Sequence, residues 1–376
     1  MMLGKRFNHR IGIIGCGIIG ATIAYELSLV PGLEVTLFER RSPASGATGA
    51  ALGVLMGAIS TKTRGRAWQL RQASIKRYQT LIPELETLTG TEIPRNDQGI
   101  VLLCFEEKWW EKWGKILEIR RNQGWELRKW SLAQLKDSCP QIESDRLIGA
   151  IYSPGDRQIN PTELTKVLVA GAGKNGVNCQ FDITVEKIES VIDSQSQLNR
   201  VYALETSAQS YELDWLVIAA GLGSIPLIRP LSPTVEMSPI LGQAMEIQLP
   251  QRLGKSDFQP VITGHDTHIV PLGNNQYWLG ATVEFPHSSK VPLPDTQKLE
   301  KLKSQAIEFC PKLAEASMIR TWSGYRPRPQ GRPAPIIETL VGYQNVILAT
   351  GHYRNGILLA PATAAAAREM MVNHGR

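Results

Sequence analysis

Three glycines spaced as Gly-x-Gly-x-x-Gly near the start of the chain constrain its fold more than any other feature. They are Gly15, Gly17 and Gly20, and they lie between a short β-branched run, residues 10–14, and an apolar helical pattern, residues 21–30. In a strand–turn–helix unit, the first glycine permits the tight turn, the second lets a phosphate approach the backbone, and the third lets the helix pack closely against the strand. The helix N-terminus favours an anion at this turn. The segment therefore predicts a parallel sheet that binds a phosphate-bearing ligand.

An acidic residue at the end of the next predicted strand indicates which class of ligand is bound. The strand spans residues 34–38, and Glu39 follows it. A carboxylate at this place can accept both hydrogen bonds from an adenosine ribose, which favours a bound dinucleotide over a glycine-rich turn without a ligand. The arginines after Glu39 invite the 2′-phosphate of NADP, but Glu39 would repel it. The small, glycine-rich segment 42–55 can lie beside an extended cofactor with little steric cost, so FAD is favoured over NAD.

Length and composition restrict the class of protein. The chain has 376 residues, more than one hydrophobic core comfortably serves, so about two domains are expected. Its net charge of +6 comes from dispersed basic residues, which argues against nucleic-acid binding. The five cysteines show neither zinc-site spacing nor a disulfide framework, so a reducing cytoplasm is expected. No stretch approaches the roughly 20 apolar residues of a membrane span, and no membrane association is expected.

Periodic patterns predict the elements in the middle of the chain. Helices are expected at 63–88, 106–121, 161–172 and 299–316. Pro83 is expected to break or kink the first, and the Asn160 cap with Pro161 starts the third. Strands are expected at 100–105, 181–188 and 211–220, and hairpins between 239 and 285 with a turn at Gly273-Asn274-Asn275. His265 and His268 form an H-x-x-H pattern, but strand spacing places them on opposite faces, so no metal site is expected.

The C-terminal segment predicts a second strand–turn–helix unit. A strand at 346–349 enters a turn at Gly351, and a helix begins near Gly356. The free N–H groups of residues 355–358 can face the N1 and C2 carbonyl of a flavin, where reduction places negative charge. Arg354 lies near the positive end of this helix, where a cation is disfavoured. An anionic substrate is the natural partner for it.

Together with the N-terminal glycines, the segment VILATGHYRNGILLAPATA (346–364) resembles the D-amino acid oxidase family of FAD enzymes, and its glycine oxidase branch most closely. The resemblance covers essentially the whole chain. It implies a Rossmann-type α/β FAD-binding domain of discontinuous segments, 1–75, 145–228 and 326–376. It also implies an α+β substrate domain on a largely antiparallel sheet, 76–144 and 229–325. No cysteine lies near Arg326, so the FAD is expected to be non-covalent.

The resemblance also implies the site. Arg326 matches the family's carboxylate-binding arginine, whose planar guanidinium holds a carboxylate through two hydrogen bonds, and Arg328 is the alternative. We expect Arg354 to help it, and His268, Val283 and Val54 to lie beside the substrate. The family often has tyrosine where His268 stands. Expected cofactor contacts are Gly15, Gly17, Ile18, Ile19, Gly20, Glu39, Arg40, Thr48, Gly53, Val185, Gly221, Gly351, His352, Tyr353, Arg354, Asn355, Gly356, Ile357 and Leu358.

The expected activity is oxidative deamination of glycine or a similar small amine acid. Hydride passes from the substrate's Cα to flavin N5, and positioning carries this step without a side-chain base. The products are glyoxylate, ammonia and, after reoxidation by molecular oxygen, hydrogen peroxide. The resemblance implies supply of the glycine imine for the thiazole of thiamine, with thiazole synthase as a partner, and it is compatible with a homo-oligomer. A D-amino acid or sarcosine oxidase, a quinone-linked dehydrogenase and a non-catalytic nucleotide-binding scaffold remain as alternatives.

Overall fold

A six-stranded sheet forms around the strand that precedes the N-terminal glycine turn. The computed structural model describes residues 9–232, 235–287 and 290–373. In spatial order the sheet comprises β19 (Ile336–Thr339), β20 (Val346–Thr350), β13 (Trp215–Ile218), β1 (His9–Ile14), β2 (Leu33–Glu39) and β9 (Asn178–Phe181). All neighbours run parallel except β19 and β20, which are antiparallel. Four of the strands therefore end at the same edge as β1, where the glycine turn lies.

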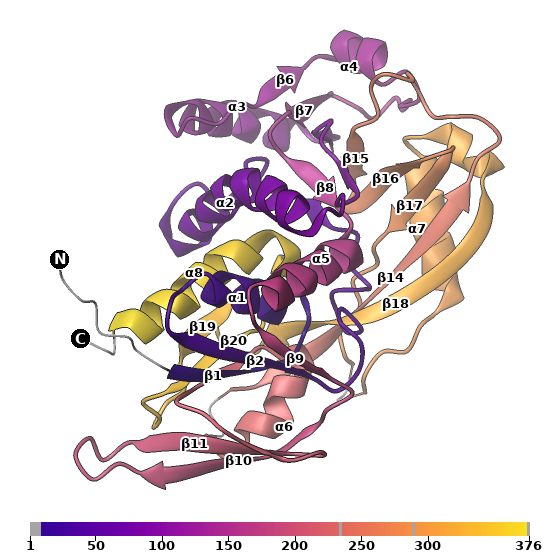
Figure 1. Ribbon diagram of the computed structural model, residues 1–376. Coiled ribbons are helices and arrows are strands. Elements are labelled where there is room, and N and C mark those ends of the chain that lie inside the picture. Colours follow the sequence, from indigo (N-terminus) through magenta and orange to yellow (C-terminus); the bar gives the residue numbers. More distant parts are fainter. Residues whose placement is uncertain (1–8, 233–234, 288–289, 374–376) are drawn as a thin grey trace.

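Both faces of this sheet are covered, as parallel sheets require (Figure 1). One face carries the helices α1 (Ile18–Ser28), α2 (Gly65–Thr89), α5 (Pro161–Lys174) and α8 (Gly356–Asn373), which share one apolar core with it. The other face packs against a three-stranded antiparallel sheet of β10 (Val185–Ile192), β11 (Asn199–Thr206) and β12 (Ser210–Glu212). The short elements η1 (Gly221–Gly223) and α6 (Ser224–Ile228) follow β13.

A second large sheet of eight mostly antiparallel strands lies beside the first (Figure 1). In order it comprises β18 (Ser317–Pro329), β14 (Met237–Gln248), β17 (Gln276–Gly280), β16 (Thr267–Gly273), β15 (Val261–Gly264), β5 (Ile100–Cys104), β7 (Gly149–Ser153) and β6 (Arg128–Trp130). One face packs on α4 (Leu132–Ser138), α7 (Thr296–Ile307) and η2 (Pro311–Glu315), and the other on α3 (Glu107–Asn122). The remaining small sheet comprises β3 (Val54–Leu55), β8 (Arg157–Ile159) and β4 (Arg95–Asn96) in that order.

The expected fold class is confirmed, and several expected elements form, with corrections. Of the expected break or kink at Pro83, the break is absent: α2 continues to Thr89, and Tyr78, Leu81, Ile82 and Leu85 bury its apolar face. A kink at Pro83 stays a prediction. The strand expected at 211–220 divides into β12 and β13, which belong to different sheets. The strand expected at 181–188 likewise divides between β9 and β10. The helix expected at 299–316 ends at Ile307, and η2 follows it.

The expected division into two domains remains a prediction. Its boundary at residue 75 falls inside α2, and β7 pairs in the eight-stranded sheet although it belongs to the expected segment 145–228. Residues 1–8 and 374–376 of the expected FAD-binding segments lie outside the described residues. Within the part of the chain that the structure describes, no helix is both long and apolar enough to span a lipid bilayer.

Candidate active site

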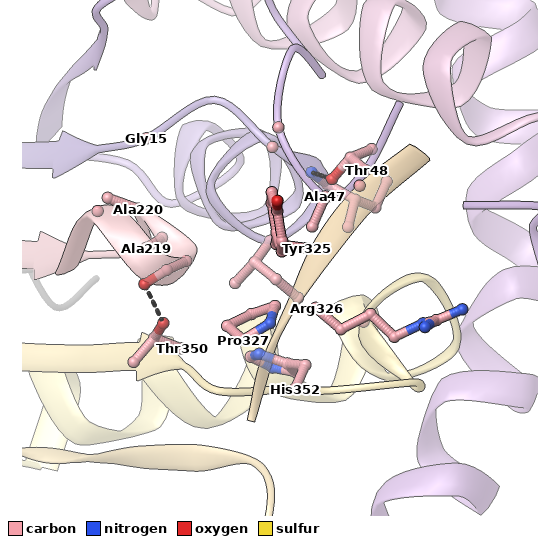
Figure 2. Close-up of a pocket in the computed structure, with 18 of the residues that line it drawn as sticks. Gly15, Ala47, Thr48, Ala219, Ala220, Tyr325, Arg326, Pro327, Thr350 and His352 are labelled. Carbon is pink, nitrogen blue, oxygen red and sulfur yellow. Dashed lines mark hydrogen bonds between the residues drawn. The ribbon is translucent and has the colours of Figure 1, made fainter. Parts of the chain in front are cut away.

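A cavity of about 480 Å³ lies where the two large sheets meet (Figure 2). The carboxyl ends of β1, β2, β13 and β20 contribute Ile14, Glu39, Ala219 and Thr350 to its lining. The eight-stranded sheet contributes His268 and Arg326. Ligands of open α/β sheets bind outside the carboxyl ends of the strands, so the cavity is where the fold itself places a ligand.

The glycine turn forms one end of this cavity. Gly15 has a left-handed φ of +103°, which favours glycine. A Cβ on Gly20 would overlap the carbonyl oxygen of Gly15, so Gly20 is what lets α1 begin this close to β1. Thr48 lies beside the turn in Figure 2, and its hydroxyl accepts a hydrogen bond of 3.0 Å from the backbone N–H of Ile18. Gly15 and Gly17 therefore present backbone to the cavity, and the Thr48 hydroxyl occupies the N–H of Ile18 at the start of α1.

Glu39 is held rigidly at the end of β2. One carboxylate oxygen accepts from the backbone N–H of Cys16 at 2.8 Å, and the other accepts from that of Arg41 at 3.0 Å. Each carboxylate oxygen has a second lone pair, so both remain able to accept from ligand hydroxyls. This geometry fits an adenosine ribose placed next to the glycine turn.

The C-terminal turn forms the other wall. Gly351 and Tyr353 have left-handed φ values of +67° and +53°, and residues 356–358 bring the N-terminus of α8 to the cavity. The buried His352 ring makes a 2.8 Å hydrogen bond between Nε2 and the Thr363 hydroxyl. Burial, with a smaller contribution from the Arg66 charge, lowers the pKa of His352 to about 3, so this ring is neutral near pH 7. The turn thus offers a positive helix end to a ligand.

Arg326 is half-buried on the edge strand β18, and Figure 2 shows its side chain extending away from Gly15. Its Nη1 donates to the carbonyl oxygens of Leu241 at 3.2 Å and Thr282 at 3.0 Å. Burial and, secondarily, the charge of Arg354 lower the pKa of Arg326. The guanidinium of Arg328 instead lies over the rings of Phe285 and Tyr353, with centroid distances of 5.2 and 5.6 Å. Of the two arginines considered for the carboxylate, Arg326 lines the cavity.

Two further polar groups lie near Arg326. Arg354 forms a 3.2 Å ion pair with Asp266, whose side chain is 77% exposed, so this pair lies at the solvent side of the cavity. His268 is half-buried, and its Nδ1 lies 2.9 Å from the Thr263 hydroxyl. Burial, then the Arg354 charge, lowers the pKa of His268 to about 4. His268 is therefore a neutral hydrogen-bonding group near pH 7.

The cavity brings most of the expected site residues together. Its lining includes Gly15, Gly17, Ile18, Ile19, Glu39, Arg40, Thr48, Gly53, Val54, Val185, Gly221, His268, Arg326, Gly351, His352, Tyr353, Arg354, Gly356, Ile357 and Leu358. Three expected residues are not among those that line the cavity. Gly20 packs against Gly15, the Asn355 side chain accepts a 3.0 Å hydrogen bond from Arg71 Nη2, and near Val283 it is Ala281 that lines the cavity.

Sequence reasoning missed several lining residues, among them Ala47, Tyr325, Asp266 and Ala281. Tyr325 is adjacent to Arg326 and Ala47 belongs to the small-residue segment, so local signals existed for both. Nothing in the local sequence around Asp266 indicates its ion pair with Arg354. His265 lies in the β15–β16 turn and stacks on Phe105, with ring centroids 3.9 Å apart. Among the described residues, no cluster of three or more His, Cys, Asp or Glu side chains could hold a metal ion.

Comparison with known proteins gives the family. The model of the FAD dependent oxidoreductase family matches residues 10–370. The chain belongs to this family. It is 32% identical to the bifunctional protein ThiO/ThiG of Trichormus variabilis over 96% of this chain and 52% of that protein. It is 26% identical to the glycine oxidase of Geobacillus kaustophilus, over 94% of this chain and 91% of that one.

The fold agrees with this membership. The crystal structure of glycine oxidase from Bacillus cereus superposes with a TM-score of 0.83 at 26% identity, covering 97% of this chain and 95% of that chain. This chain spans about half the length of the bifunctional relatives that it matches.

The residues of this FAD-dependent oxidoreductase fit its cofactor. The glycine turn and the N-terminus of α1 would hold the pyrophosphate, and Glu39 the adenosine ribose. The turn before α8 would hold the flavin end, where the helix dipole favours negative charge. None of the five cysteines, all of which are free and lie in the described residues, lines the cavity.

Proposed function

We propose that the protein oxidises the amine of glycine or a similarly small amino acid. The observation that carries this proposal is the Arg326 guanidinium, which is half-buried in the same cavity as the cofactor-binding turns. A half-buried guanidinium that lines a cavity can bind an anion there through its remaining N–H groups, and a substrate carboxylate would supply one. The relatives named glycine oxidase support a small amino acid in particular.

The chain's own residues orient the substrate in this mechanism. Arg326 binds the carboxylate and fixes the position of Cα, and His268, being neutral, accepts or donates a hydrogen bond without repelling an amine. Bound FAD supplies a two-electron acceptor for the hydride that leaves Cα. The amine loses one proton as the C=N bond forms, and water then hydrolyses the imine to glyoxylate and ammonia. Molecular oxygen would accept the two electrons with two protons, one carried by the hydride and one released by the amine, and become hydrogen peroxide.

The anaerobic visible spectrum of the purified holoenzyme, recorded before and after glycine is added, tests the proposal. Bleaching of the flavin bands by glycine supports it. If the flavin spectrum does not change with glycine but bleaches with sarcosine, proline or a D-amino acid, that compound is the substrate instead. A protein that bleaches with none of them is not an amino-acid oxidase. Absence of peroxide in aerated turnover would favour a quinone-linked dehydrogenase.

We also propose that the glycine imine, where it is not hydrolysed, passes to a second enzyme in thiamine thiazole formation. The relatives named bifunctional protein ThiO/ThiG support this, since this chain matches about half of each. A thiazole synthase is the expected partner. The five free thiols support a reducing compartment such as the cytoplasm. Co-purification tests this partnership: the oxidase should co-purify with a thiazole synthase and not with an unrelated enzyme.

A further inference from the structure

Gly242 lies directly against the guanidinium group of Arg326. It is on β14, opposite Gly324 of β18, and Ile240 is opposite Arg326. A Cβ built on Gly242 would lie 2.5 Å from Arg326 Cζ and closer still to both terminal nitrogens, whereas real Cβ atoms essentially never approach within 3.0 Å. Any side chain at this position would therefore displace the guanidinium.

Backbone conformation does not account for this glycine. Gly242 lacks the left-handed φ that requires glycine at positions such as Gly15 and Gly351. A glycine in the interior of a strand weakens the strand, and it often marks the close approach of another group. In this case the group that approaches is Arg326.

Two fixed carbonyl groups hold the guanidinium in the space above Gly242. They belong to Leu241 and Thr282, and both accept from Nη1. Leu241 exchanges two backbone hydrogen bonds with Glu284, of 3.0 and 2.9 Å, which joins the two segments. The buried Glu284 carboxylate accepts from Gln243 Nε2 and the Thr282 hydroxyl, each at 2.7 Å.

This arrangement divides the five N–H groups of the arginine. The two hydrogens of Nη1 are used by the two carbonyls, so Nη2 and Nε form the remaining edge. That edge has the spacing for a bidentate carboxylate. A guanidinium moved or turned by a side chain at 242 would lose the Nη1 contacts and the orientation of this edge.

We propose that Gly242 is a positioning residue for the substrate carboxylate: it leaves the space in which the backbone holds Arg326 in its binding orientation. The proposal rests on the proposed function for its kinetic consequence, whereas the packing of Gly242 against Arg326 does not depend on the substrate.

The test is a double-mutant cycle of Gly242→Ala and Arg326→Ala. Gly242→Ala should lower kcat/KM for glycine by about 100-fold, since misplacement by about 1 Å has this effect. The double variant should lose nothing beyond Arg326→Ala alone. Because the guanidinium is the end of a flexible side chain, it can shift at little cost. Gly242→Ala should therefore lower the melting temperature only slightly in the wild-type background, through the lost Nη1 hydrogen bonds, and not in the Arg326→Ala background, where the guanidinium is gone. Gly173→Ala is a control for kcat/KM, since nothing lies within 4 Å of a Cβ there. This glycine is exposed and helical, so its replacement by alanine should leave kcat/KM unchanged and raise the melting temperature slightly.

Several outcomes would overturn the proposal. They are kcat/KM of Gly242→Ala within threefold of wild type, kinetic losses that simply add in the double variant, and an equal fall in melting temperature in both backgrounds. If Gly242→Ala does not fold, folding of the double variant supports the proposal, and failure of both while Arg326→Ala folds overturns it. If glycine does not reduce the wild-type flavin, the proposed function fails. The melting-temperature cycle still tests whether Gly242 packs against Arg326.

Discussion

At the scale of single residues, Arg326 and Arg328 lie on the same strand and can be compared directly by substitution. Arg326 lines the cavity, whereas Arg328 is exposed and lies over two aromatic rings. Arg326→Ala should lower kcat/KM for glycine by about 30- to 1,000-fold, because a lost charged hydrogen-bonded pair costs roughly 2–4 kcal/mol. Arg328→Ala, the control, should stay within a few-fold of wild type. Steady-state peroxide production measures both, and a loss within about threefold for Arg326→Ala would exclude the carboxylate role.

The ion pair of Asp266 with Arg354 makes a second prediction at this scale. Asp266→Asn should free Arg354 without much loss of stability, because an exposed pair contributes little. The positive potential at the cavity should rise, so KM for glycine should fall a few-fold at low salt and return towards the wild-type value at high salt. Kinetics at two ionic strengths measure this. Asp137→Asn, which breaks the exposed Lys255–Asp137 pair, is the control. A KM that does not depend on salt would contradict the prediction.

At the scale of elements, the turn before α8 carries a titratable group whose effect on stability has a definite sign. The folded-state pKa of His352, about 3, lies below that of an unfolded histidine, about 6.5. The stability that depends on its neutral form is therefore fully present above about pH 6.5 and is lost as the pH falls towards 3. The melting temperature of the holoenzyme should fall across this range, and His352→Gln should flatten the curve. His287→Gln, a substitution at an exposed position, should not change the dependence of the melting temperature on pH from that of the wild type.

How far the elements could be predicted depends on where the deciding interaction lies. The glycine turn, the Asn160–Pro161 helix start and the Gly273–Asn275 hairpin are fixed by neighbouring residues, and the sequence predicts all three. The strand at 211–220 shows no local break, because its division comes from pairing with β11 in one sheet and β1 in another. No local pattern distinguishes Ala281, which lines the cavity, from Val283, which does not, and the Asp266–Arg354 pair joins residues far apart in the sequence.

At the scale of the whole molecule, the cofactor would contact segments that lie far apart in the sequence. The glycine turn, Glu39 and the turn before α8 come from different parts of the sequence and line one cavity. A ligand that binds only the folded state stabilises it by about 2.7 kcal/mol at a free concentration of 100 times Kd. FAD added to the apoprotein should therefore raise the melting temperature with concentration. FMN lacks the adenosine that Glu39 and the glycine turn would hold, so it should stabilise less. Equal stabilisation by FMN and FAD would mean that the glycine turn and Glu39 do not bind the adenosine. Glu39→Gln should weaken the binding of FAD but not that of FMN, and this difference would locate the contact.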